Sequence, residues 1–151
     1  MATFNSRTGR GPGVGDRSPV PVSFANKPAD SVVQFIKVPF GFRLNRLILR
    51  HEDGNGTPIV PTAGTLTVER DDDGTLTNQL DGASIDLTSL TSEGTMLYVT
   101  AALGAGDGRL LSATATDRDY VEGDLLRLTA VNLACNAEAS LYVWVTVAET
   151  P

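Results

Sequence analysis

The amino-acid sequence predicts an all-β protein, namely a single antiparallel β-sandwich, jelly-roll-like or Ig-like, with an extended N-terminal arm. Three observations lead to this expectation. Residues 140–147 alternate between apolar and polar or aromatic side chains. Eight or so short apolar runs are separated by turns rich in Gly, Asp and Asn, and no helix of useful length stands out. Residues 1–30 have the composition of an arm, and residues 31–151 that of the sandwich domain.

The closing run has two different faces, because side chains alternate along a strand. Leu141, Val143 and Val145 fall on one side and require a core, whereas Tyr142 and Trp144 fall on the other. Aromatic rings with a polar tip suit a protein interface or a half-covered sheet face. We therefore expect Tyr142 and Trp144 either at a subunit interface or in the inner layer beneath a second sheet.

The first half of the domain contains three further strands and a hairpin. The expected strands are residues 31–38, 43–52 and 64–70, and a short return strand is expected within 75–80. The run Asp71-Asp72-Asp73-Gly74 predicts a hairpin turn, since Asp-Gly supplies the positive φ that such turns need. The spacing of Ile85, Leu87 and Leu90 is compatible with either a strand or a short helix.

The second half continues the same pattern. Residues 95–102 read as a strand, residues 103–108 as a Gly-rich loop, and residues 109–115 with 118–121 as a broken strand. Residues 125–131 leave the tight turn Glu122-Gly123-Asp124 as a strand with Leu126, Leu128 and Ala130 on one face. A loop holding Cys135 then leads into the closing strand.

The N-terminal segment 1–30 is expected to be a flexible basic arm, because it is rich in Gly and Pro. Its arginines, Arg7, Arg10 and Arg17, are candidates for binding acidic surface on a partner. Val20, Val22 and Phe24 alternate with Pro19 and Pro21 between them. Since proline cannot donate to a ladder, this piece is either an edge strand or an extended arm. As an arm it would add a strand to a neighbour's sheet.

Charge and composition bound the function. Residues 1–50 hold eight Lys or Arg against two acids, a net charge of +6, whereas residues 51–151 hold four against sixteen, a net charge of −12. A basic segment on an acidic body can dock on acidic neighbours, including copies of itself. Three arginines without interleaved aromatics do not indicate nucleic-acid binding. No run is long enough for a membrane span, and no secretory signal is present at the start.

Motifs for catalysis or metal binding are lacking. The single histidine, His51, lies between Arg50 and Glu52, a common surface pattern. Cys135 is the only cysteine and is expected to be a small buried side chain. Asp71 and Asp73 are the first candidates for a metal, but the sequence after them does not follow the EF-hand pattern. We therefore expect no enzyme, no cofactor and no metal site.

Several short segments resemble small virion proteins of tailed bacteriophages. They are Gly64-Thr65-Leu66-Thr67-Val68, Asp86-Leu87-Thr88-Ser89-Leu90, the run from Val121 to Leu128 and the closing Leu141-Tyr142-Val143-Trp144-Val145. The similarity covers roughly residues 31–149. It implies a capsid decoration (cement), head-fibre or small tail protein, and it implies no enzyme site.

The resemblance leads to a specific expectation about function. The chain would be made in the host cytoplasm and would then decorate and stabilise the capsid exterior, as a homotrimer bound to adjacent copies of the major capsid protein. The candidate partner-binding residues are Arg7, Arg10, Arg17, Val20, Val22, Phe24, Tyr142 and Trp144. The alternative is a carbohydrate- or receptor-binding module of a fibre or tail, which would use the loops 52–63 and 103–108. Nucleic acid and membrane are not expected as partners.

Overall fold

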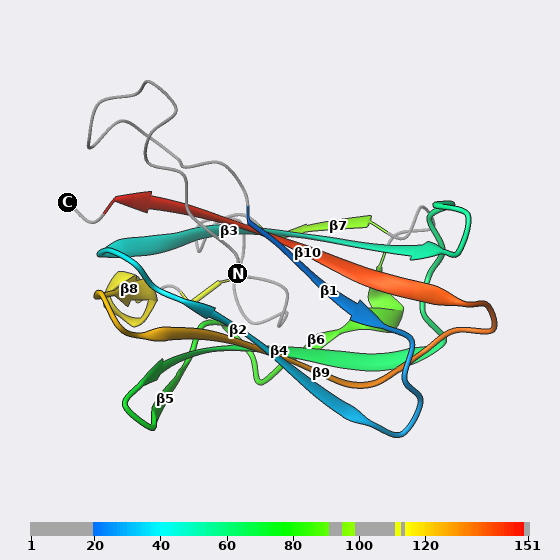
Figure 1. Cartoon of the computed structure of the whole chain (residues 1–151), viewed down its shortest axis with the longest axis horizontal. Coiled ribbons are helices and arrows are strands. Elements are labelled where there is room, and N and C mark those ends of the chain that lie inside the picture. Colours follow the sequence, from blue (N-terminus) through cyan, green and yellow to red (C-terminus); the bar gives the residue numbers. More distant parts are fainter. Residues whose placement is uncertain (1–19, 91–94, 99–110, 113, 150–151) are drawn as a thin grey trace.

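The computed structural model describes residues 20–90, 95–98, 111–112 and 114–149, and these form two packed antiparallel sheets (Figure 1). The first sheet, sheet A, has the order β1 (Val20–Ala25), β10 (Ala139–Glu149), β3 (Phe42–Asp53) and β7 (Thr95–Tyr98), and β8 (Asp119–Tyr120) also pairs with β3. Sheet B has the order β2 (Ser31–Lys37), β9 (Leu125–Ala134), β4 (Ala63–Asp72) and β5 (Thr75–Asn78), and β6 (Ile85–Asp86) also pairs with β4. The predicted all-β sandwich is confirmed.

Strand order selects the jelly roll over the Ig-like alternative. The first strand, β1, pairs with the last strand, β10, and the second strand, β2, pairs with the second-to-last strand, β9. An Ig sandwich instead keeps hairpin-connected strands together within one sheet. Here successive strands cross repeatedly from one sheet to the other, as in a long hairpin rolled into two layers.

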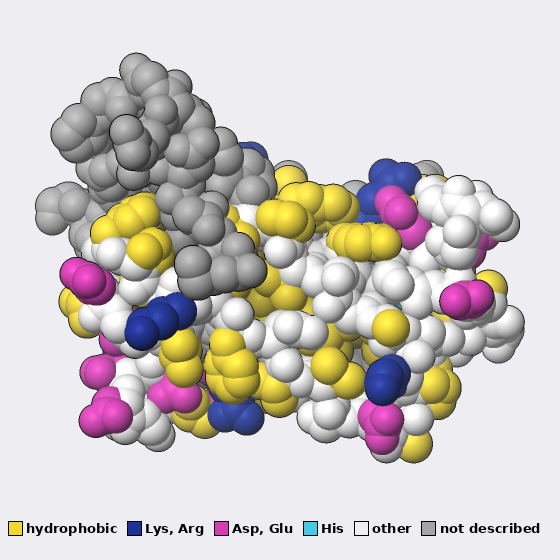
Figure 2. All heavy atoms as spheres, viewed as in Figure 1, with side chains coloured by type: hydrophobic (Ala, Val, Ile, Leu, Met, Phe, Trp, Pro, Cys, Tyr) yellow, Lys and Arg dark blue, Asp and Glu magenta, His cyan; other side chains and the backbone are white. Residues whose placement is uncertain are grey.

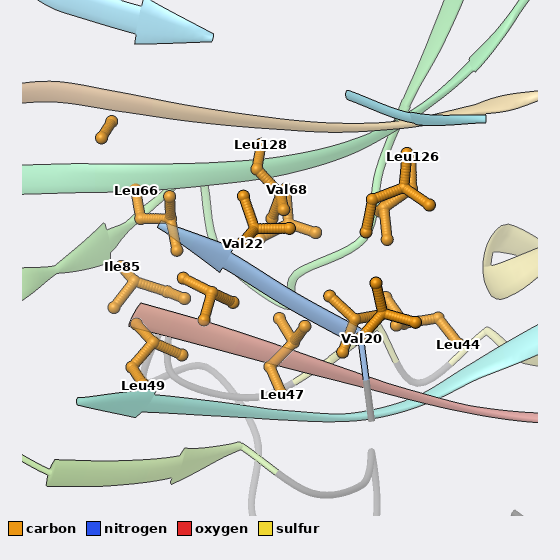
Figure 3. Packing of buried hydrophobic residues seen from close by; sticks show 14 of the residues in the cluster. Val20, Val22, Leu44, Leu47, Leu49, Leu66, Val68, Ile85, Leu126 and Leu128 are labelled. Carbon is orange, nitrogen blue, oxygen red and sulfur yellow. The ribbon is translucent and has the colours of Figure 1, made fainter. Parts of the chain in front are cut away.

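The core lies between the inner faces of the two sheets (Figure 3). Sheet B contributes Leu66, Val68, Leu126 and Leu128, each buried as the alternation in the sequence predicts. Sheet A contributes the inward faces of its strands, including Leu141, Val143 and Val145 of β10. Burying one such side chain contributes about 1.5–3 kcal/mol, so these alternating runs hold the two layers together.

β1 belongs to the sandwich, so the boundary expected after residue 30 is wrong in position. Residues 20–25 pair with β10 from Val20 opposite Val145 to Ala25 opposite Ser140. The backbone N–H of Asn26 donates to Ala139 O at 3.0 Å, which directs the even-numbered residues of β1 toward β10. Pro21 therefore turns its backbone nitrogen toward the side of β1 that pairs with no described strand, where a missing N–H costs no ladder bond.

A bulge in β3 explains why both faces of this strand look partly apolar in the sequence. Leu44 and Leu47 are both fully buried although they are three residues apart. The register with β10 shifts between Thr146 and Val147, because Thr146 pairs with Arg46 while Val147 pairs with Leu44. The extra residue, Asn45, changes the phase of the strand, which returns Leu44 to the inner face.

One turn and one strand position require their glycines. The β4–β5 hairpin turns through Asp73 and Gly74 with φ of 48° and 91°, as the Asp-Gly signal predicts. Gly64 has φ of 132° and packs closely, since a Cβ there would lie 3.0 Å from Leu133 Cα. This position faces an irregularity in the pairing of β4 with β9. Gly64 thus permits both the backbone conformation and the close approach of the two strands.

Two regions differ from or refine the sequence expectation. Ile85 lies in β6, Leu87 begins a 3₁₀ helix (Leu87–Ser89), and both are buried with Leu90, so strand and helix each account for part of the run. In the broken strand expected over 109–115 and 118–121, the prediction is wrong for Ala115 and Arg118, because a 3₁₀ helix (Ala115–Arg118) occupies the break before β8. Neither of these 3₁₀ helices, nor any other helix among the described residues, could span a membrane.

Candidate functional site

The outer face of sheet A carries the strongest candidate for a binding surface. Tyr142 and Trp144 point away from the core and are half-buried, with ring centroids 5.9 Å apart and planes tilted by 31°. Their register partners on β3 are Arg50 and Ile48, and those on β1 are Ser23 and Pro21. We call the surface formed by these six residues the aromatic face.

The structure decides between the two places that the sequence allows for Tyr142 and Trp144, the outer surface and the layer between the sheets. Leu141, Val143 and Val145 are fully buried and fill the layer between the sheets. Tyr142 and Trp144 lie on the opposite side of β10, so they are not the inner layer beneath a second sheet. Ile48 extends the apolar part of this face, although alternation within β3 alone did not single it out.

Charge borders the aromatic face on the β3 side. The Arg50 guanidinium is paired with Glu52, and the Arg46 Nε atom is buried without a hydrogen-bond partner. Thr146, next to Trp144 on the same side of β10, is 1% exposed, and its hydroxyl also lacks a partner. The surface therefore combines aromatic rings with arginine side chains, two residue types that are enriched at protein interfaces.

The N-terminal candidates divide into two groups. Arg7, Arg10 and Arg17 lie outside the described residues. Val20, Val22 and Phe24 are 2%, 8% and 1% exposed and pack in the chain's own core. The expectation that these three side chains add a strand to a neighbour's sheet is therefore wrong. Pairing with the chain's own β10 avoids the entropic cost of association that a neighbour's sheet would impose.

His51 is a core residue, and the expectation of a surface histidine is wrong. Its side chain is fully buried on the inward side of β3. Its Nδ1 atom lies 3.2 Å from Ile59 O, so Nδ1 carries the proton and donates, and the Nε2 atom has no partner. Burial lowers the pKa of His51, which the bond to Ile59 offsets only in part. The ring therefore holds the base of the 52–63 loop as a neutral donor.

Three arginines tie the segment 115–119 to both sheets. Arg43 of β3 forms a bidentate pair with Asp119, with Nε–Oδ1 at 2.6 Å and Nη2–Oδ2 at 2.9 Å. Arg70 of β4 donates to Thr116 O at 3.2 Å and to Asp119 O, and Arg118 donates to Leu44 O at 2.9 Å. Desolvation and the nearby Arg43 charge lower the pKa of Arg118. This cluster closes one end of the sandwich through carbonyl acceptors and one carboxylate.

The remaining candidate groups have structural roles. Asp71 accepts a hydrogen bond from Gly74 N at 2.7 Å within its hairpin, and Asp53 accepts from Asn55 N and Thr57 N in the 52–63 loop. Cys135 is half-buried, with its Sγ atom 3.9 Å from Val60 O. Within the described ranges, no three His, Cys, Asp or Glu side chains gather as metal ligands would. Residues 103–108 lie outside the described part of the chain.

Comparison with known proteins identifies no relative of the chain. No protein-family model, curated protein or solved structure matches the chain.

Proposed function

We propose that this chain is a structural protein of a tailed-phage virion that decorates the capsid exterior and stabilises the shell by binding adjacent capsid subunits. The aromatic face is the observation that carries the proposal. Half-buried Tyr and Trp side chains on the outer side of a sheet, bordered by arginine, have the composition of an interface centre. The short resemblances to phage virion proteins support the same assignment.

The position of residue 20 gives the proposal a mechanism. Val20 pairs with Val145, and Pro21 pairs with Trp144, so the chain enters the sandwich beside the aromatic face. The basic residues Arg7, Arg10 and Arg17 precede this point. In the proposed assembly the aromatic face contacts one capsid subunit, and residues 1–19 reach acidic surface on the next. Linked contacts of this kind, repeated in a homotrimer, raise shell stability by avidity without any chemistry.

Capsid binding by matched variants tests the proposal. A Tyr142→Ala/Trp144→Ala variant is expected to lose at least tenfold in affinity for empty phage capsids, since buried aromatic anchors contribute 2 kcal/mol or more when they are hot spots (about 30-fold each). Val121→Ala, at a 64% exposed position that lies outside the aromatic face and outside all strands, is the control. The measurement is co-sedimentation with a panel of purified empty capsids. Equal binding by the aromatic-face variant and the control would refute the role of this face.

Removal of residues 1–19 tests the arm separately. A cut after residue 30 would also remove β1 and part of the core, so the deletion ends before Val20. The truncated chain is expected to keep the unfolding midpoint of the full chain and to bind capsids more weakly. Saturation of capsids at the same concentration as the full chain would remove the arm from the mechanism.

A carbohydrate- or receptor-binding module of a fibre or tail is the second candidate. Jelly rolls occur in lectin domains as well as in viral capsids, so the fold alone favours neither candidate. One observation favours the loop 52–63 as a preformed binding loop. Its base is pinned by His51 Nδ1 to Ile59 O and by Ile59 N to His51 O at 2.9 Å. A glycan array with signal that disappears on substitution within this loop would favour this candidate over capsid decoration.

A further inference from the structure

Among the described residues, sheet B ends in two edge strands, each with one side that forms no ladder. β2 pairs only with β9, and β5 pairs only with β4 over Thr75–Asn78. Beyond Asn78 the chain meets residues 111–112, because Leu80 bridges to Leu111 and Ser112 N donates to Gln79 O at 2.8 Å. Val38 N donates to Asp124 O and Asn132 N donates to Asp30 O, so the even-numbered residues of β2 face β9. The odd-numbered residues, including Val33 and Phe35, therefore direct their N–H and C=O groups toward the free edge.

The same alternation identifies the free groups of β5. Gln79 N donates to Val68 O at 2.9 Å, so the odd-numbered residues of this hairpin arm face β4. Leu76 and Asn78 then direct their backbone groups away from the sheet. Each edge thus offers two consecutive outward-facing residues, Val33 and Phe35 on β2 and Leu76 and Asn78 on β5. A seven-residue edge strand with free backbone groups is a template for pairing with another chain.

The two edges also carry exposed apolar side chains on the same face. Phe35 is 53% exposed and Leu76 is 43% exposed, and with Val121 they make up the exposed large hydrophobic residues of the described chain. Two rows of register partners cross sheet B from β2 to β5. One row is Lys37, Leu125, Asp71 and Leu76, and the other is Phe35, Arg127, Glu69 and Asn78. Both apolar side chains therefore stand on the outer face of sheet B, at its opposite edges.

Charge distinguishes the two edges. Both lysines of the chain, Lys27 and Lys37, lie on or beside β2, and one acid, Asp30, accompanies them in residues 20–41. Residues 71–90, which hold β5 and β6, contain five aspartates and no Lys or Arg. Figure 2 shows acidic side chains gathered at the end of the molecule where the β4–β5 hairpin lies. The β2 edge of one copy is thus electrostatically complementary to the β5 edge of another.

We propose that copies of this chain associate head to tail, with β2 of one copy pairing antiparallel with β5 of the next and continuing sheet B across the contact. Placing Phe35 opposite Leu76 of the neighbour also places Val33 opposite Asn78. Each of these pairs then exchanges two backbone hydrogen bonds. The same register places Lys37 beside the turn that contains Asp72 and Asp73. A β2–β2 contact would instead join two edges of the same sign and leave Leu76 exposed.

A head-to-tail contact has a consequence for assembly. Because the two surfaces differ, such contacts build a ring if the rotation closes and an open filament if it does not. The inference concerns self-association alone and does not depend on what surface the assembled copies bind. A ring of three would agree with the homotrimer in the proposed function, and a ring of another size would remove the trimer but leave the contact.

Disulfide trapping in the full chain tests the contact directly. Cys135 is first replaced by serine, and Phe35→Cys and Leu76→Cys are made separately, with a size tag on one of them. Cα atoms of a hydrogen-bonded antiparallel pair lie about 5.5 Å apart, which is within reach of a disulfide. We expect mild oxidation of the mixed single variants to give a covalent dimer with one copy of each. The Phe35→Cys/Leu76→Cys double variant is expected to give a ladder whose last band counts the copies in a ring.

Three results would overturn the proposal. Dimers formed by Phe35→Cys alone, as abundant as those in the mixture, would indicate β2–β2 pairing. Mixed dimers no more abundant than those of a Val121→Cys control, which is also exposed, would indicate random collision. A monomer by light scattering at the highest soluble concentration, with no trapped product, would exclude the contact. In all cases circular dichroism of each variant checks that the fold is kept.

Charge reversal provides an independent readout. Lys37→Glu is expected to weaken self-association about two- to fivefold, as one exposed ion pair would. Asp72→Lys in the same chain is expected to restore it, because the reversed pair has the same attraction. Weakening by Lys37→Glu that Asp72→Lys does not restore would place Lys37 in a different contact.

Discussion

Acidification is expected to destabilise the fold through His51. The ring is fully buried, donates through Nδ1 to Ile59 O, and leaves Nε2 without a partner. Protonation would place a charge and an unpaired N–H among apolar side chains. Leu141 is its register partner on β10, and the charged neighbours Arg50 and Glu52 lie on the other face of the strand. Among the described residues, no carboxylate forms a hydrogen bond or ion pair with the ring.

The sign and size of the effect follow from the lowered pKa. Burial places the folded-state pKa of His51 below its ordinary value of 6.5. The unfolded chain therefore binds the proton first, and the full stability is present above pH 6.5. As the pH falls below 6.5, the free energy of unfolding decreases by at most about 1.4 kcal/mol per pH unit, until the folded-state pKa is reached.

Urea unfolding at pH 7.5, 6.5 and 5.5 measures this dependence. His51→Asn is the matched control, because its amide can still donate to Ile59 O but does not titrate. The native chain is expected to lose up to about 1.4 kcal/mol more than the variant between pH 6.5 and 5.5. Carboxylates titrate in both proteins and cancel in the difference. Parallel pH profiles for the two chains would show that His51 is not desolvated as described.

Two further predictions concern the backbone. Gly64→Ala is expected to lower the free energy of unfolding by about 1–3 kcal/mol, because it forces an alanine into φ of 132° and sets its Cβ 3.0 Å from Leu133 Cα. Gly74→Ala is the control, because Gly74 also has positive φ but an added Cβ there would meet no atom within 4 Å. This variant measures the cost of the backbone conformation alone. Equal losses of stability at both positions in thermal unfolding would argue against the close approach at Gly64. Val22→Pro is expected to cost about 3 kcal/mol or more, since it removes a β1–β10 ladder bond, whereas Pro21→Ala is expected to change stability by less than about 1 kcal/mol. Denaturant titration of the Val22→Pro and Pro21→Ala variants measures the two losses of stability. Equal losses would mean that β1 is not paired with β10 in this register.

Local pattern was sufficient for most strands because each has one buried face. The alternation in residues 64–70 and 125–131 identified the inward residues Leu66, Val68, Leu126 and Leu128 correctly, since a strand in a sandwich buries every second side chain. The Asp-Gly turn between β4 and β5 was predicted for the same kind of local reason. The aromatic residues of the closing strand were assigned to one side of it, but not to the inside or the outside of the sandwich.

Local pattern failed where distant residues decide the environment. His51 sits between two charged residues, yet it is buried because the odd-numbered positions 47–51 of β3 face inward after the bulge at Asn45. Arg118 is only 9% exposed, and Leu44 O, which accepts its hydrogen bond, lies far away in the sequence. No signal near either residue in the sequence reports these partners.

The fold class, most strand positions and the division into a basic leading segment and an acidic body could be predicted from the sequence, because these properties depend on composition and on residue order within a few positions. Three features became visible only in the folded chain: β1 completes sheet A, the sandwich is a jelly roll, and Phe35 and Leu76 stand at opposite edges of one sheet. Each of these depends on which strands pair across large sequence separations, and that choice is made by the packing of the whole core.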